Sequence, residues 1–302
     1  MNFKKALFIY NPKSGNRKIP LVLDEIIEKL MDKHISIIPV RLDEHIYCKI
    51  EDILSSYEYD YVYAAGGDGT IMFVASKLIK LGIDKPLGVI GAGTCNNFAA
   101  NIGMPSGISE SIDVISQGHT QYVDYGELGD GRLFLSSVAA GVFAQISFET
   151  DQNIKEHLGP FAYYLRGITQ LPNIRPYEFT VKTQDETVKE NAYLVMVLTG
   201  SNIGSIRGMM NDRSDIQDGL FEVMIVKETN PMDLGDMLVK VVRGEDISES
   251  KSIKVLKGSR IEIDCNNKQI GVSVDGEKGP DLPFKIKVQK KAINVIVGEN
   301  LV

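Results

Sequence analysis

Several features that define other protein classes are absent from this chain of 302 residues. Its three cysteines, Cys48, Cys95 and Cys265, form no CxxC pair and have no histidine at ligand spacing, which argues against a disulfide framework or a zinc site. No stretch of about 18 residues is apolar throughout, and the first apolar run is too short for a signal peptide. We therefore expect a cytoplasmic protein whose contact with a membrane, at its inner surface, is peripheral.

An excess of positive charge is also absent. Lysine and arginine number 33 against 40 aspartates and glutamates, which gives a net charge of −7 and predicts no nucleic-acid partner. No glycine-rich loop carries the lysine of a Walker A motif, and the first strand lacks GxGxxG with an acidic residue about 20 positions later. These two absences argue against a P-loop site and against a dehydrogenase.

What the sequence does contain is the usual balance of a globular protein, with 43% hydrophobic and 24% charged residues. Because single cores stop growing near about 250 residues, this length predicts two domains. In the first part we expect strands at 5–12, 35–42, 60–66 and 86–93 and helices at 18–34, 49–57 and 70–82. This alternation predicts an α/β domain, a parallel sheet with helices on both faces.

From about Tyr122 the sequence changes to short β-rich runs separated by turn residues. Strands are expected at 122–128, 132–143, 177–183, 192–201, 220–228, 252–265, 270–277 and 284–298, with helices at 157–171 and 230–244. Many strands with two helices predict a β-sandwich-like second domain. The boundary near 118–124 is short, which predicts two domains that close on a shared cleft.

Three polar loops follow strands of the first part: NPKSG (11–15), GGDGT (66–70) and GAGTCNN (91–97). Ligands of such sheets bind where parallel strands end, so we expect these loops to meet. Their glycines bring bare amides close to a ligand, and a helix N-terminus near Thr70 adds its dipole, which suits phosphate oxygens. Lys13 supplies a cation, whereas Asp68 repels phosphate unless a cation or donor compensates. Each loop alone is equally well an ordinary turn with a helix cap.

Taken together, these motifs resemble the bacterial diacylglycerol kinase and lipid kinase family, which is related to the sphingosine kinases. The resemblance covers essentially the whole chain, through the three loops, LGPFAYYLRGI (158–168), DGLFEVMIVK (218–227) and VSVDGE (272–277). It implies an α/β nucleotide-binding domain at 1–122, completed by a C-terminal strand at 291–302, and a β-sandwich domain for substrate and metal at 123–290. It also implies ATP and Mg²⁺ as cofactors and a lipid alcohol as the acceptor.

Site residues follow from the resemblance position by position. Nucleotide contacts are expected at Asn11, Pro12, Lys13, Ser14, Gly15, Gly66, Gly67, Asp68, Gly69, Thr70 and Thr94. Catalytic carboxylates are expected at Asp275, Glu277 and Asp68, with Asp275 as the general base on the lipid hydroxyl. Magnesium ligands are expected at Asp215, Asp218 and the carbonyl of Leu220, an oxygen-only set that Mg²⁺ prefers. As local sequence, both the Asp-Gly-Glu and the Asp-Gly segments are equally turn signals.

The chain departs from the family pattern at several polar positions. Met72 and Phe73 replace the Asn and Glu that usually follow GGDGT, and Asn97 and Phe143 stand where aspartates are usual. The segment 199–219 also lacks a run of three glycines and the proline that follows it. Because one lost contact in phosphoryl transfer can cost several kcal/mol, these losses predict a site that is slow, differently selective or inactive, whereas the retained Asp68, Asp218, Asp275 and Glu277 argue against full degeneration.

The leading hypothesis is therefore an ATP-dependent lipid kinase that phosphorylates a hydroxyl of a diacylglycerol-like acceptor. A catalytically weak regulator that binds nucleotide or lipid is the alternative, motivated by the missing acidic positions. An NAD kinase is a further one, although LTGSNIGS (198–205) only begins like the segment that would bind the acceptor dinucleotide. The identity of the acceptor and the oligomeric state, with a homodimer as one option, stay open.

Overall fold

The computed structural model describes residues 3–141, 175–200, 215–243, 245–248, 250–298 and 301. The chain divides into two compact units, Met1–Val123 with Lys291–Val302 as unit 1 and Asp124–Lys290 as unit 2. The predicted helix at 157–171, the segment 158–168, Phe143 and most of the segment 199–219 lie outside the described residues. None of the described helices is both long and apolar enough to cross a bilayer.

Unit 1 contains a parallel sheet in the order β15-β4-β3-β1-β2. The strands are β1 (Lys4–Tyr10), β2 (Ile35–Arg41), β3 (Tyr61–Gly66), β4 (Leu87–Gly91) and the last part of β15 (Phe284–Ile296). The apolar runs of β1, β3 and β4 are buried on both faces, as in a sheet covered by helices, whereas the edge strand β2 is partly exposed. The predicted α/β fold of this part of the chain is confirmed.

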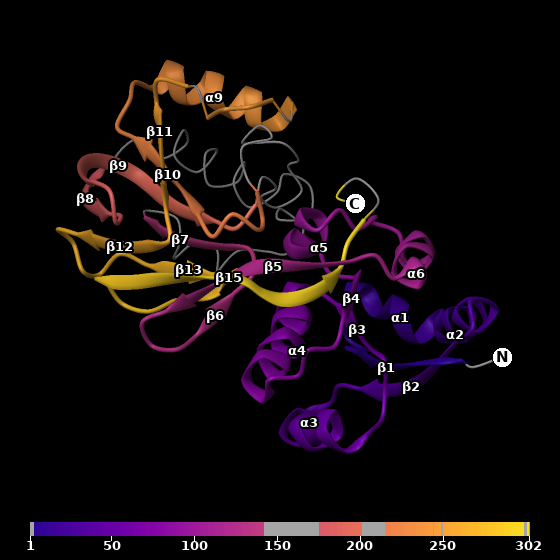
Figure 1. Ribbon diagram of the computed structural model, residues 1–302. Coiled ribbons are helices and arrows are strands. Elements are labelled where there is room, and N and C mark those ends of the chain that lie inside the picture. Colours follow the sequence, from indigo (N-terminus) through magenta and orange to yellow (C-terminus); the bar gives the residue numbers. More distant parts are fainter. Residues whose placement is uncertain are drawn as a thin grey trace. The chain divides into compact units, whose positions relative to one another are not determined.

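Helices cover this sheet on both sides (Figure 1). They are α1 (Lys18–Leu21), α2 (Leu23–Asp32), α3 (Glu44–Ser56), α4 (Asp68–Leu81), α5 (Asn97–Asn101) and α6 (Ile108–Gln117), with a short 3₁₀ turn at Gly15–Arg17. In Figure 1, α3 and α4 pack together on one side of the strands and α2 and α6 on the other. Because β1 lies between β2 and β3, the connections that leave β1 and β3 run in opposite directions. The ends of β1 and β3 therefore form the topological switch point at which such sheets bind ligands.

Unit 2 is built from antiparallel strands that form the predicted sandwich-like domain. Its path runs β14-β13-β7-β9-β8-β12-β15, with β10 beside β9, β11 beside β10, and β5 beside β15 and β6. The strands are β5 (Thr120–Leu128), β6 (Leu133–Phe134), β7 (Ser137–Gly141), β8 (Tyr177–Lys182), β9 (Thr187–Leu198), β10 (Phe221–Lys227), β11 (Ile253–Gly258), β12 (Arg260–Cys265), β13 (Val272–Val274) and β14 (Glu277–Lys278). The predicted helix at 230–244 is α9 (Pro231–Arg243).

Two helix predictions need correction, and one further helix was not predicted. The single helix expected at 18–34 is two helices, because Val22 leaves helical dihedrals and shares its N–H between the carbonyls of Lys18 and Ile19. The helix expected at 49–57 begins earlier, since the Asp43 side chain caps it by accepting from the N–H groups of His45 and Ile46. Helix α6, which the sequence pattern did not reveal, begins after Gly107.

Candidate functional site

The loops after β1 and β3 are joined by side-chain hydrogen bonds to one another. Asn11 donates through Nδ2 to Thr70 Oγ1 at 3.2 Å, and its main-chain N–H donates to the Ala65 carbonyl at 3.0 Å. The same side chain accepts from the N–H of Lys13 at 2.9 Å, which folds NPKSG into a tight turn. Ser14 Oγ accepts from the N–H of Gly67 at 3.4 Å. Two predicted nucleotide loops are thus held as one cluster.

The third loop, GAGTCNN (91–97), approaches the other two so closely that only glycine fits at the points of contact. A Cβ on Gly93 would lie 2.5 Å from Gly67 Cα, and a Cβ on Gly15, whose φ is +54°, would lie 2.0 Å from the Ala92 carbonyl oxygen. The backbone of the loop after β1 is therefore in close contact with that of the loop after β4 at Gly15. The three loops approach one another through bare backbone, as their glycine content predicted.

The carboxylate of Asp68 is used within this cluster. Its Oδ1 accepts from the main-chain N–H of Phe98 at 3.3 Å, at the start of α5. Burial raises the pKa of this carboxyl, and the amides of Phe98, Asn97 and Asn96 oppose that shift by stabilising its charged form. These backbone donors therefore offset part of the cost of burying the Asp68 charge.

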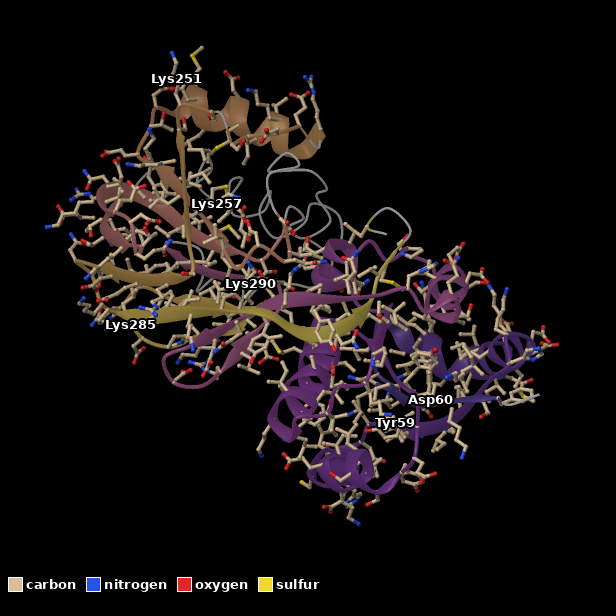
Figure 2. The ribbon with its side chains drawn as sticks, in the orientation of Figure 1. Tyr59, Asp60, Lys251, Lys257, Lys285 and Lys290 are labelled. Carbon is tan, nitrogen blue, oxygen red and sulfur yellow. The ribbon has the colours of Figure 1, made fainter. Side chains whose placement is uncertain are left out.

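The described residues at the other edge of the sheet form contacts of a different kind. Asp60, at the amino-terminal end of β3, accepts through Oδ2 from the N–H of Lys5 at 2.8 Å, and the Tyr59 hydroxyl donates to the Leu54 carbonyl at 2.7 Å (Figure 2). These contacts tie strand and helix ends together. Polar groups with exposed donors gather at the carboxyl edge instead.

The donors at the carboxyl edge fit the phosphates of a nucleotide. Lys13, Gly69 and Thr94 are exposed, and Gly69 lies in the first turn of α4, where N–H groups lack intrahelical partners. The Asn97 Oδ1 atom is buried without a hydrogen-bond partner among the described residues. A cation, exposed amides and hydroxyls around one helix N-terminus are the donor set that phosphate oxygens need.

Phe73, one of the departures from the family pattern, packs between helices. Its ring meets that of Tyr47 edge-on at 4.7 Å between centroids, and Lys77 Nζ lies 5.5 Å from the ring centre. Lys77 and Lys80 also bind the Glu51 carboxylate at 2.7 and 2.9 Å, so α3 and α4 are joined by apolar and ionic contacts. These two lysines lower the pKa of Glu51 to about 2, Lys77 having the larger effect. Phe73 thus has a structural role on this helix pair.

Asp275 in unit 2 is held by three main-chain donors. Its Oδ2 accepts from the N–H of Leu135 at 2.9 Å, and its Oδ1 accepts from those of Ser136 and Ser137 at 3.0 and 2.8 Å. Asp275 and Gly276 both have positive φ and join β13 to β14 as a two-residue hairpin turn. The turn interpretation and the functional one are therefore compatible, because the turn fixes the carboxylate in one orientation.

Sequence reasoning missed the groups that support this carboxylate. Thr199 Oγ1 donates to the Leu135 carbonyl at 2.5 Å, which braces the segment that binds Asp275. The buried Ser136 Oγ has no hydrogen-bond partner among the described residues. A Thr at the end of an apolar strand was the only signal in the sequence. Glu277 begins β14 and is exposed.

The predicted magnesium ligands lie in one turn before β10. Asp218 Oδ1 accepts from the N–H of Leu220 at 2.8 Å, and Asp215 Oδ1 accepts from that of Gln217 at 2.9 Å. Asp124, which the sequence reasoning also missed, is buried in β5 and accepts from the N–H of Gly219 at 2.6 Å. In the sequence, the sign of this role was an aspartate inside a segment that was predicted to be a strand. Asp124 fixes this turn to the sheet.

Two lysines border the same turn (Figure 2). Lys290 Nζ donates to the Asp218 carbonyl at 2.9 Å, and Lys257 Nζ lies 3.9 Å from Asp218 Oδ2 and 2.8 Å from the buried Glu222. In the described part of the chain no three acidic, histidine or cysteine side chains converge as a metal site. The predicted turn thus offers two carboxylates and a carbonyl, and one or two carboxylates are what Mg²⁺ takes from protein when substrate phosphates supply the rest.

The structure therefore forms three clusters from the predicted residues. Unit 1 gathers the nucleotide loops with Asp68, and unit 2 gathers the Asp275 turn and, separately, the turn at 215–220. Of the predicted residues in unit 1, Lys13, Gly69 and Thr94 are the exposed ones, whereas Pro12, Gly66 and Thr70 are buried beneath them.

Comparison with known proteins accounts for both units. Residues 5–128 match the diacylglycerol kinase catalytic domain, and residues 136–297 match the YegS C-terminal NAD kinase beta sandwich-like domain. A diacylglycerol kinase of Staphylococcus epidermidis is 33% identical over 282 residues, which are 93% of this chain and 88% of that protein. One of Staphylococcus saprophyticus is 30% identical over 99% of this chain and 97% of its own length.

A solved structure shares the fold over the full length. The crystal structure of a Bacillus anthracis protein assigned as a diacylglycerol kinase matches with a TM-score of 0.85 at 26% identity, and the match covers 100% of this chain and 98% of that one. The catalytic-domain match in unit 1, the sandwich match in unit 2 and the full-length relatives agree. The chain belongs to the bacterial diacylglycerol kinase family.

Proposed function

We propose that this protein transfers the γ-phosphoryl group of ATP to a hydroxyl of a diacylglycerol-like lipid. It is an ATP-dependent lipid kinase. The observation that carries this proposal is the meeting of three glycine loops at the switch point of the parallel sheet, in a chain whose relatives are diacylglycerol kinases along nearly their whole length. An exposed lysine beside the amides of a helix N-terminus suits a phosphate group.

ATP binds through its phosphates to unit 1 in this proposal. Lys13 neutralises phosphate charge, and Gly69 and Thr94 offer donors from the loops after β3 and β4. Asn11 acts indirectly, because its side chain fixes the Lys13 turn and reaches Thr70. Asp68 is assigned a positioning role on the start of α5. Positioning of this kind supplies most of the catalysis in phosphoryl transfer.

Asp275 is the proposed general base. Three amide hydrogen bonds hold its carboxylate in one orientation, from which it accepts the proton of an attacking hydroxyl. The demand on the base is modest, because the attacking oxygen loses its proton late in a loose transition state. Glu277, two residues later and exposed, is proposed to act at the same point.

Magnesium is proposed to enter bound to the ATP phosphates, where it neutralises charge that develops during transfer. Asp215, Asp218 and the Leu220 carbonyl are its proposed protein contacts, and their oxygens are the kind of ligand that Mg²⁺ takes together with substrate phosphates.

The test is direct. The purified full-length chain is incubated with Mg²⁺, γ-labelled ATP and mixed micelles that contain diacylglycerol or another lipid alcohol, and labelled lipid is separated by chromatography. We expect label in diacylglycerol or a close analogue. ATP binding by calorimetry without label in any lipid would instead identify a binding protein. A reaction with NAD and ATP serves as the control for an NAD kinase, and we expect it to yield no NADP.

A further inference from the structure

A groove on unit 2 crosses several strands, and its lining residues belong neither to the Asp275 turn nor to the turn at 215–220. It has a volume of about 630 Å³ and runs over β8, β12 and β15 to the turn that follows β5. Its lining residues are Glu127, Leu128, Gly129, Lys182, Thr183, Gln184, Arg260, Ile261, Glu262, Lys285, Ile286 and Lys287. This volume is in the range of small-molecule sites.

Positive charge dominates this groove, although the chain as a whole is acidic. Four cationic side chains face two carboxylates, and Lys285 lies 3.6 Å from Glu262. Glu127 accepts from Gln289 Nε2 at 2.6 Å. Among the described residues, no ion pair is recorded for the three remaining cations. These are Lys182, Arg260 and Lys287.

The pairing of strands places two of these cations directly opposite each other. In the antiparallel pair of β12 and β15, Arg260 is the partner of Lys287, and Glu262 is the partner of Lys285. Lys182 on β8 lies opposite Glu262 from the other side. Like charges at directly opposed positions destabilise a sheet. An anion bound between Arg260 and Lys287 neutralises the repulsion between their positive charges and so removes this cost.

The walls of the groove are fixed by the fold. Gln184, in the turn after β8, accepts through Oε1 from the N–H of Ser259 at 3.0 Å, and Thr183 beneath it is buried. On the other side Gly129 donates to the Lys285 carbonyl at 2.9 Å. Buried residues complete the lining, so the backbone of the groove is in place before any ligand arrives.

We propose that this groove is an anion site for a phosphate ester, held between Arg260 and Lys287 with Lys182 as a third contact. Guanidinium and ammonium groups around one point are the donors that phosphate oxygens take, Arg in a forked geometry and Lys as a point charge. Two sources share this chemistry, the headgroup of an acidic phospholipid and a soluble organic phosphate. The site is independent of the proposed kinase reaction, because its residues take no part in it.

The experiment measures binding without ATP or turnover, so its failure is distinct from failure of the kinase proposal. The full-length chain is sedimented with phosphatidylcholine vesicles that do or do not contain phosphatidylglycerol, and separately titrated with fructose 1,6-bisphosphate by calorimetry at low salt. The double variant Arg260→Gln/Lys287→Gln is compared with the control Lys240→Gln/Lys251→Gln, which removes two exposed cations outside the groove. Figure 2 shows Lys251 beside α9 and Lys285 of the groove on β15.

We expect the groove variant to weaken binding of one probe about 30-fold and the control to weaken it less than about threefold. Vesicle binding alone identifies a headgroup, and bisphosphate binding alone identifies a soluble ligand. The unliganded groove variant should unfold at the same temperature as the wild type or higher, because the opposed cations are gone. Lys182→Gln, which leaves the opposed pair intact, should weaken binding about fivefold.

Three outcomes contradict the proposal. The first is that neither probe binds the wild type. The second is equal loss in the groove variant and the control, which means general attraction to charge. The third is a lower unfolding temperature of the groove variant, which means that the opposed cations stabilise the sheet without a ligand.

Discussion

The glycine loops of unit 1 and the Asp275 turn of unit 2 are positioned in different ways. In unit 1 each loop follows its own strand directly, and neighbouring loops meet because parallel strands end at one edge. In unit 2 the Asp275 carboxylate is held by amides at 135–137, about 140 residues earlier in the chain. The first arrangement follows from local sequence and sheet topology, whereas the second depends on one long-range strand pairing.

This difference predicts how each region fails when it is changed. The loops depend on backbone clearance, so a single added methyl group should disrupt them. The Asp275 turn depends on side-chain charge and hydrogen bonds, so an isosteric change should remove its chemistry and leave its shape. Single substitutions in the two regions distinguish dependence on backbone clearance from dependence on side-chain charge.

The largest effect is expected for Asp275→Asn. The amide oxygen can still accept from the N–H groups of Ser136 and Ser137, but the Leu135 N–H loses its acceptor and the negative charge is lost, so turnover should fall about 10²- to 10⁴-fold. ATP affinity, measured by calorimetry, should stay unchanged if the nucleotide is held by unit 1. The control is Asp281→Asn, at an exposed position of the following loop. Unchanged turnover in Asp275→Asn would remove this residue from the base assignment.

The second effect concerns backbone clearance at Gly15. In Gly15→Ala the new Cβ meets the Ala92 carbonyl oxygen at 2.0 Å, and φ is +54°, so we expect the free energy of unfolding to fall by about 2–4 kcal/mol and ATP binding to weaken. Gly82→Ala is the matched control, since φ is +64° there but no atom lies within 4 Å of the new Cβ. It should cost about 1 kcal/mol. If Gly15→Ala and Gly82→Ala lost the same free energy of unfolding in urea, the contact between Gly15 and the Ala92 carbonyl would not be tight.

The third effect is a pH dependence that arises from Asp68. Burial raises the pKa of this carboxyl, so the folded state holds its proton more firmly than the unfolded state. The resulting stability is present at low pH and is lost as pH rises from the ordinary carboxyl range through the raised pKa. Asp68→Asn should remove this loss. Urea unfolding at a series of pH values should give a flatter profile for the variant; parallel profiles would contradict the shift.

The smallest effect is expected at Glu51, which joins α3 to α4. Its pKa is lowered to about 2 from 4.5 by Lys77 and Lys80, so its contribution is present above pH 4.5 and is lost as pH falls toward 2. Glu51→Gln should make the unfolding temperature less sensitive to acid, with little change in ATP binding. Because the pair is at the surface, added salt should reduce the difference. A variant with the same acid sensitivity as the wild type would assign the contact no role.

Part of the architecture could be predicted from local sequence alone. The strands β1, β3 and β4 are continuous apolar runs, and each leads into a loop that contains glycine. This pattern predicts buried parallel strands with ligand loops at their ends. Helix α4 was also predictable, because Ile71, Val74, Ala75 and Leu78 repeat at helical spacing. The break at Val22 was not, since a shared N–H depends on backbone geometry rather than on composition.

The features of the candidate site likewise divide into those that the sequence predicts and those that it does not. The sequence by itself determined which loops contain bare amides, a lysine and an aspartate, because glycine and charge are properties of single residues. Only the tertiary structure decided that Asp68 turns to α5, that Phe73 packs on Tyr47, and that Asp124 fixes the turn at 215–220. It also placed Arg260 opposite Lys287. These contacts join residues far apart in the chain, and their partners are set by strand register and helix packing, which local sequence does not encode.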